Sequence, residues 1–322
     1  MRLQIILCAF IAYGVSGNVI IENDEQIVPL IVGGTPAAAG EFQGKISLQY
    51  TDGTHICGGT LIDPGHVLTS ATCVTNQWGD VLHPSEYRLM GDDLTISVIS
   101  GNANRQIRLA THVFVHPEFN LNRTEHDIAV IRVNETFTPS ITFNPVPRGQ
   151  DSPGVNTQCS VAGWGSTAQS AGNSFTLMRV NAVVISRAVC NSNTSYAGSV
   201  RGGMFCAGNI AGGQGTCQND EGGGLICNNA VFGVVSRAQG CAVANFPTIY
   251  TDVAVYNTWI DSIINWNEGE HEIVPTPTSI TSTTTPVPTT TIPTTTPYPD
   301  DAAIVAKSMY LFVACLTILL FR

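Results

Sequence analysis

The chain has 322 residues, of which 43% are apolar, 12% are charged and 31 are glycine. This length allows one large or two small domains, and the glycine content suits a β-rich fold with many tight turns. The net charge of −10 argues against nucleic acids and anionic membrane surfaces as partners, because no basic run is available to attract them. We therefore expect no nucleic-acid partner.

The N-terminus has the pattern of a secretory signal. A basic start is followed by an apolar run from Ile5 to Val15 and by a small-residue exit at Gly17. This pattern predicts a signal peptide over residues 1–17, with a buried N-terminal strand as the alternative. Secretion places the protein in an oxidising compartment, where cysteines pair.

After a short acidic segment over residues 18–30, a long region reads as a globular β domain. From Ile31 to about residue 267, short apolar runs alternate with Gly, Asn, Asp and Pro. This spacing predicts an all-β barrel or sandwich. The runs are ISLQY, GGTLI, HVLTS, DIAVIRV, CSVAGWG, VFGVVS and TIYTDV. A helix is predicted at the end of the region, because apolar residues recur there at a spacing of three to four: Val253, Tyr256, Ile260, Ile263 and Ile264.

The composition changes abruptly after the β domain. Residues 268–300 are rich in Thr and Pro, and cannot bury enough apolar surface to offset the entropy of ordering. We expect an extended, O-glycosylated, mucin-like stalk there. Residues 301–322 combine small residues with an apolar tail, which predicts a GPI-attachment signal, with a short transmembrane helix as the alternative. Either one tethers the protein outside the cell, with the membrane as a partner.

Modification sites follow from the secreted context. Ten cysteines are present, of which Cys8 lies in the predicted signal peptide and Cys315 in the predicted tail. The remaining eight are consistent with four disulfides, and the count alone leaves their pairing open. Three sequons predict N-glycosylation, at Asn122, Asn134 and Asn193.

Eight motifs in a fixed order connect residues 31–267 to a known family. They are Ile31-Val-Gly-Gly34, Cys57-Gly-Gly-Thr-Leu61, Leu68-Thr-Ser-Ala-Thr-Cys73, His126-Asp-Ile-Ala129, Cys159-Ser-Val-Ala-Gly-Trp-Gly165, Met204-Phe-Cys-Ala-Gly208, Cys217-Gln-Asn-Asp-Glu-Gly-Gly223 and Pro247-Thr-Ile-Tyr-Thr251. In this order they resemble the trypsin/chymotrypsin-like serine proteases. The resemblance implies an all-β fold of two antiparallel six-stranded β-barrels with a C-terminal α-helix. It also implies four disulfide pairs: Cys57–Cys73, Cys159–Cys227, Cys190–Cys206 and Cys217–Cys241.

The resemblance places the catalytic triad at Thr72, Asp127 and Glu221. Acyl transfer of this kind needs an imidazole base and a hydroxyl nucleophile beside the aspartate. Thr72 stands at the histidine position and has no group that titrates near neutral pH, and Glu221 stands at the serine position. From this we predict a catalytically degenerate homologue that is not an enzyme.

The neighbouring positions of the site are also altered. The resemblance assigns the oxyanion-hole N–H groups to Asn219 and Glu221, where a carboxylate opposes the developing charge. His55, His66, His116 and His126 are not expected to replace the missing base. We expect no cofactor and no metal.

Asp127 would lie buried without its imidazole, which is costly unless other donors satisfy it. Thr72 and Ser236 are the expected donors. We also expect Asp127 and Glu221 to approach closely enough for one of them to hold a raised pKa.

The ligand pocket and its activation are implied by the same resemblance. The N-terminal activation pair would be Ile31 and Asp220, although Leu30 precedes Ile31 where the family usually has Arg or Lys. The pocket positions are Gly215 at the floor, Ala238 and Thr248 at the walls, Ser236 and Arg237, the last replacing a tryptophan. Strand addition by an extended peptide remains possible along Ser236–Ala238, because it depends on main-chain groups.

The favoured interpretation is a non-catalytic serine protease homologue at the cell surface that binds or regulates extracellular proteins or peptides. One alternative is an active endopeptidase with unconventional catalysis. A second alternative is a glycosylated surface-display protein without a specific ligand.

Overall fold

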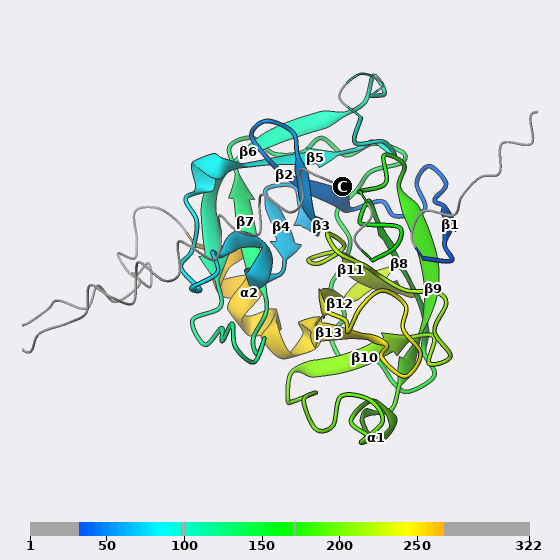
Figure 1. Ribbon diagram of the computed structural model, residues 1–322. Coiled ribbons are helices and arrows are strands. Elements are labelled where there is room, and N and C mark those ends of the chain that lie inside the picture. Colours follow the sequence, from blue (N-terminus) through cyan, green and yellow to red (C-terminus); the bar gives the residue numbers. More distant parts are fainter. Residues whose placement is uncertain (1–31, 98, 100, 170–171, 267–322) are drawn as a thin grey trace, which may run out of the picture. The chain divides into compact units, whose positions relative to one another are not determined.

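A computed structural model describes residues 32–97, 99, 101–169 and 172–266. The signal peptide, the acidic segment, Ile31, the stalk and the C-terminal tail predicted from the sequence lie outside these residues. Within them, two groups of six antiparallel strands lie side by side (Figure 1). No helix in the described part of the chain is long and apolar enough to cross a membrane.

The first barrel is closed in the strand order β2-β3-β4-β7-β6-β5. Its strands are β2 (Lys45–Tyr50), β3 (His55–Asp63), β4 (His66–Thr69), β5 (Tyr87–Gly91), β6 (Gln106–Val115) and β7 (Ala129–Val133). Alternate side chains of these strands fill the barrel with a core that includes Ile46, Leu48 and Leu89. Two short 3₁₀ helices follow β4, namely η1 (Ala71–Val74) and η2 (Pro84–Glu86).

The second barrel closes through the order β8-β9-β10-β13-β12-β11, because β8 pairs with both β9 and β11. Its strands are β8 (Gln158–Gly163), β9 (Met178–Ile185), β10 (Met204–Gly208), β11 (Gly224–Cys227), β12 (Ala230–Arg237) and β13 (Thr248–Asp252). The short strand β1 (Thr35–Pro36) adds to β9, and helix α1 (Arg187–Cys190) follows β9. The predicted fold of two six-stranded barrels is confirmed.

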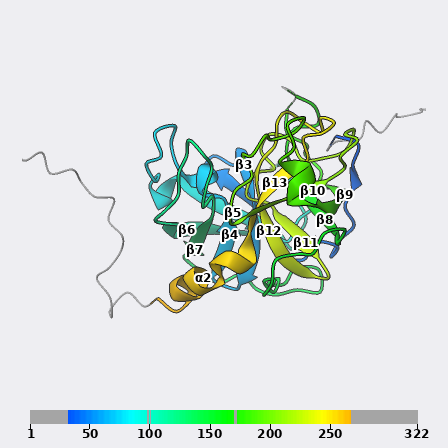
Figure 2. The same cartoon turned by 90° about the horizontal axis from the view of Figure 1, so that it is seen from below.

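A helix lies at the end of the described part of the chain, as predicted. A 3₁₀ turn, η3 (Val253–Tyr256), leads into α2 (Asn257–Ile264). Figure 2 shows α2 beneath β4, β6 and β7 of the first barrel, although it follows β13 of the second. Its residues Ile260 and Ile263 are buried in a core cluster with Leu68 from one barrel and Val231 from the other. The helix therefore helps to join the two barrels.

The predicted disulfides are all formed: Cys57–Cys73, Cys159–Cys227, Cys190–Cys206 and Cys217–Cys241. The first lies in the first barrel and the other three lie in the second, so each cross-links one barrel only. Their presence fits an oxidising, extracellular environment. Asn122, Asn134 and Asn193 are all exposed, as glycan acceptors must be.

Candidate active site

Thr72, Asp127 and Glu221 come together where the two barrels meet. Thr72 lies in η1, Asp127 lies two residues before the start of β7, and Glu221 lies in the turn before β11. Thr72 and Glu221 line a cleft of about 480 Å³, whose walls also include Asn219, Ser236 and Arg237. The triad positions implied by the sequence therefore share one site.

Asp127 is fully buried and is held by hydroxyl and main-chain donors. Its Oδ1 accepts the N–H of Thr72 at 2.9 Å, and its Oδ2 accepts the hydroxyls of Ser236 at 2.6 Å and Thr72 at 3.3 Å. The two expected donors are thus confirmed. Burial raises the pKa of Asp127 to about 6, and these hydrogen bonds only partly offset that rise.

Removing the donor closest to Asp127 should destabilise the protein in a pH-dependent way. In Ser236→Ala, a buried carboxylate loses its 2.6 Å hydrogen bond, which typically costs about 1–3 kcal/mol. The loss should be largest at pH 8, where Asp127 is ionised, and smaller at pH 5, where it is protonated. Denaturant unfolding at both pH values measures it, with the exposed Ser262→Ala as the control. An equal loss at the two pH values would contradict the assignment.

The Glu221 carboxyl occupies the donors that the family resemblance assigns to the oxyanion hole. The N–H of Asn219 donates to Glu221 Oε2 at 2.7 Å, and the N–H of Glu221 itself also interacts with the carboxyl. Burial is the main reason that the pKa of Glu221 rises to about 7, and the negative charges of Asp220 and Asp127 add to it. Both Glu221 and Asp127 hold raised pKa values, and burial rather than their proximity is the leading cause.

His55 holds the turn that carries these donors, through a contact with the main-chain carbonyl of Asn219. Asn219 has a φ of +71°, in the left-handed region that asparagine tolerates better than most residues. Its carbonyl lies 3.0 Å from Nε2 of His55, whose Nδ1 lies 2.7 Å from the Ser47 hydroxyl. His55 therefore contacts the site through the main-chain carbonyl of Asn219. His66 instead pairs with Asp63.

Asp220 lies beneath the same turn and accepts two main-chain hydrogen bonds from described residues. Its oxygens accept the N–H groups of Gly165 and Cys217, each at 2.9 Å. Burial raises its pKa to about 6, and the cation of Lys45 counters part of that rise. Ile31 lies outside the described residues, but its neighbour Val32 bridges to Gly215.

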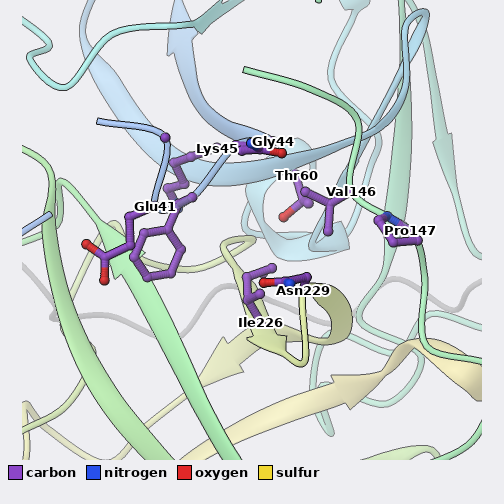
Figure 3. A pocket seen from close by; sticks show the side chains of 12 residues that line it. Glu41, Gly44, Lys45, Thr60, Val146, Pro147, Ile226 and Asn229 are labelled. Atoms are coloured by element: carbon purple, nitrogen blue, oxygen red, sulfur yellow. The ribbon is translucent and has the colours of Figure 1, made fainter. Parts of the chain in front are cut away.

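Lys45 is a site residue that the sequence did not reveal. It is buried on β2, its Nζ has no hydrogen-bond partner among the residues that the structure describes, and burial lowers its pKa to about 8. The Nζ fits there because Gly58 and Gly223 have no side chains: a Cβ on either would lie within 2.9 Å of it. Lys45 also lines a separate cavity of about 350 Å³ with Thr60, Val146, Ile226 and others (Figure 3).

Side chains take up space at the ligand-pocket positions that the family resemblance implies. The hydroxyls of Thr216 and Thr248 are 2.7 Å apart and both residues are buried. Gly215 and Ala238 are half-buried beside them. Arg237 points across the cleft wall, where its Nε donates to the Thr124 hydroxyl at 2.6 Å and its guanidinium lies 5.6 Å from the Tyr196 ring centre.

A cationic groove adjoins the cleft. It measures about 300 Å³, shares Thr124 and Arg237 with the cleft, and is also lined by Asn122, Arg123, Ser199 and Arg201. Glu125 is the carboxylate that these arginines contact, at 3.0 Å from Arg201 and 3.8 Å from Arg123. Three arginines thus line the groove, and two of them, Arg123 and Arg201, pair with one carboxylate.

Comparison with known proteins gives consistent matches. The model of the Trypsin family matches residues 31–260. Trypsin of Sus scrofa is 34% identical over 239 residues, which cover 74% of this chain and 96% of the relative. A trypsin of Xenopus laevis is 33% identical over 76% of this chain and 93% of its own length, and trypsin I-P1 of Gallus gallus is 32% identical over 82% and 99%.

The prediction that this chain is not an enzyme is corrected by these matches. The matched relatives are named trypsins, which are serine endopeptidases, and their similarity extends over nearly all of their length. Kinship therefore points to an enzyme. The prediction rested on the substitutions at Thr72 and Glu221, which change the groups that the cleft presents. The chain belongs to the trypsin family.

Proposed function

We propose that this trypsin-family domain is displayed at the cell surface and binds an extended, acidic peptide segment of an extracellular protein in its cleft. The observation that carries the proposal is the cationic groove of Arg123, Arg201 and Arg237, which continues directly from the cleft. Arginine forks bind carboxylates through paired hydrogen bonds, so this groove favours acidic side chains.

The cleft itself supports binding of a peptide main chain. Ser236 and Arg237 end strand β12 at the cleft wall, and an extended peptide pairs with such a strand end through main-chain groups. The Glu221 carboxyl holds the N–H of Asn219, so a ligand carbonyl that reaches this donor must displace it. Such an exchange is easier when Glu221 is protonated, because a neutral carboxyl accepts hydrogen bonds more weakly.

Surface display is supported by the sequence at both ends of the chain. The signal peptide over residues 1–17 directs secretion, and the Thr/Pro-rich segment over residues 268–300 holds the domain away from its anchor. The tail over residues 301–322 supplies the anchor, with GPI attachment favoured over a membrane span. Release by a phospholipase that cleaves GPI anchors distinguishes the two.

A second candidate function is peptide hydrolysis, favoured by kinship with the trypsins. A carboxyl with a pKa of about 7 in a cleft can take a proton from water near neutral pH. In that case turnover of a quenched-peptide library by the parent protein is lost in Glu221→Gln. Turnover that persists in Glu221→Gln rules out this role for the carboxyl.

Binding is tested with labelled eight-residue peptides that differ only in charge. Fluorescence anisotropy is measured on protein carrying Asn122→Gln, so that no glycan covers the groove. Acidic peptides should bind at least tenfold tighter than basic ones, and added salt should weaken them. The pair Arg201→Gln with Arg237→Gln should lower acidic-peptide affinity by about tenfold or more, since each charged hydrogen bond contributes about 1.5–3 kcal/mol.

The matched control is Arg108→Gln, which removes one arginine from the first barrel away from the cleft. It should leave binding unchanged. Equal binding of acidic and basic peptides would contradict the proposed ligand class. Absence of binding by any peptide would support the surface-display alternative instead.

A further inference from the structure

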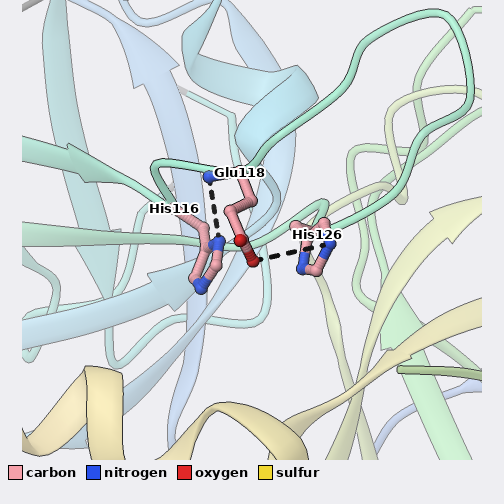
Figure 4. Close-up of side chains that lie close together, drawn as sticks. All are labelled: His116, Glu118 and His126. Atoms are coloured by element: carbon pink, nitrogen blue, oxygen red, sulfur yellow. Dashed lines mark hydrogen bonds and ion pairs between the residues drawn. The ribbon is translucent and has the colours of Figure 1, made fainter. Parts of the chain in front are cut away.

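Two histidines that are ten positions apart in the sequence lie face to face in the fold. His116 follows β6 and His126 precedes Asp127, and their rings stack with centres 5.0 Å apart and planes 9° from parallel. The carboxylate of Glu118 lies close to both histidines (Figure 4), with its Oε2 3.8 Å from Nε2 of His126. One ligand atom from each of the three residues lies within 4.8 Å of the others.

The two imidazole rings are held in place by aromatic side chains of the C-terminal helical segment. The ring of His116 packs edge-on against Tyr256 and Trp259, each at 5.1 Å between ring centres. The Tyr256 hydroxyl lies 3.1 Å from Nδ1 of His126. This contact occupies one ring nitrogen of His126 and leaves Nε2 on the side of Glu118. Hydrogen bonds of this kind orient histidine ligands in metal centres.

We propose that His116, Glu118 and His126 form a zinc site. Two imidazoles and one carboxylate are a donor set that Zn²⁺ takes in proteins, with a fourth position left for water. Tetrahedral donors at bond lengths of about 2.0–2.1 Å lie roughly 3.3 Å apart, so the present cluster needs only a small closure. Glu118 can provide it, because its side chain is 72% exposed and free to rotate.

The site would also replace weaker contacts within the cluster. The N–H of Glu118 reaches Nδ1 of His116 at a long 3.3 Å, and a metal at that nitrogen takes its place. Without metal, the pair of Glu118 and His126 is an ion pair only when the histidine is protonated. The sequence could not indicate this cluster, because only the pairing of β6 with β7 brings His116 beside His126.

Zinc here would fasten both ends of the loop over residues 117–125. Asn120 and Glu125 form a bridge within this loop, and Thr124 bonds Arg237 at the cleft wall. A metal that joins His116 to His126 therefore cross-links the two ends of this loop, next to the cleft. This inference does not depend on what the cleft binds.

The test uses the full chain, purified in detergent without a histidine tag and freed of metal by a chelator. Titration with Co²⁺ at pH 7.5 should produce visible absorption bands at one equivalent, and Zn²⁺ should displace them. His116→Ala and His126→Ala should each lower Zn²⁺ affinity at least tenfold. Glu118→Gln should lower it about tenfold, and this exposed change leaves the fold intact even if a histidine variant fails to fold.

The matched control is His83→Ala, which removes an exposed histidine outside the cluster and should leave Zn²⁺ affinity unchanged. Hydrogen exchange of residues 117–125 should slow when Zn²⁺ is added to the parent and not to Glu118→Gln. Zn²⁺ affinity that is the same in the parent, Glu118→Gln and His116→Ala would overturn the proposal, as would a parent that binds no metal.

Discussion

The double substitution Thr72→His with Glu221→Ser is expected to raise peptide hydrolysis about 10³-fold or more above the parent chain. Asp127 is already oriented by the Thr72 N–H and the Ser236 hydroxyl, so an imidazole at position 72 meets a carboxylate placed to bind it. Removal of the Glu221 carboxyl also frees the N–H of Asn219 to stabilise an oxyanion.

The measurement is kcat/KM against a quenched-peptide library, with the parent and both single variants assayed in parallel. Each single variant should gain far less than the pair, because base and nucleophile act as a unit. Adding Asp127→Ala to the double variant should reverse most of the gain. A double variant that is no faster than the parent would show that these two side chains do not limit hydrolysis in this cleft.

Replacing Glu221 by glutamine is expected to stabilise the protein at alkaline pH and not at acidic pH. The pKa of Glu221 is raised from an ordinary 4.5 to about 7 in the folded chain. The neutral carboxyl therefore favours the folded state below pH 4.5, and this contribution is lost as the pH rises through 7. Above pH 7, Glu221→Gln should be more stable than the parent by about 3 kcal/mol, because each unit of pKa corresponds to about 1.4 kcal/mol.

Denaturant unfolding of Glu221→Gln and the parent at pH 4 and pH 8 measures this difference. Glutamine keeps an oxygen that accepts the N–H of Asn219, so the comparison isolates the charge. Glu118→Gln is the matched control, because Glu118 is exposed, and it should change stability little at either pH. A stability gain for Glu221→Gln of equal size at both pH values would contradict a raised pKa.

The fold and the triad positions could be predicted because they rest on local sequence. Each of the seven apolar runs identified in the sequence contains most or all of a strand's residues or overlaps a strand, and the motifs around Thr72, Asp127 and Glu221 locate the cleft. Strand β6 is less evident from composition, because its sequence QIRLATHVFV leaves most of its side chains partly or fully exposed. The disulfide pairs followed from the family resemblance, since cysteine spacing alone leaves many pairings open.

The electrostatics of the site could not be predicted, because they depend on contacts between distant segments. In the sequence, Lys45 is a single charged residue at the start of an apolar strand. Only the fold places its cation near Asp220. The hydrogen bond from Asn219 to Glu221 depends on a turn with a left-handed residue, which sequence spacing does not reveal. His55 likewise meets Asn219 across 164 positions.

Helix α2 and the residues around it would be the first described part of the chain to meet any tension applied beyond Trp266. The helix leaves the second barrel, yet Trp266 beyond its end packs edge-on against His112 and Phe114 on β6 of the first barrel. Arg148 also binds the helix, through a hydrogen bond to Asn257 and an ion pair with Asp261. No disulfide among the described residues joins the barrels, so tension on the chain beyond Trp266 is resisted first by these side-chain contacts. Any such force would therefore act first on the contacts of Trp266 with β6, at a distance from the cleft.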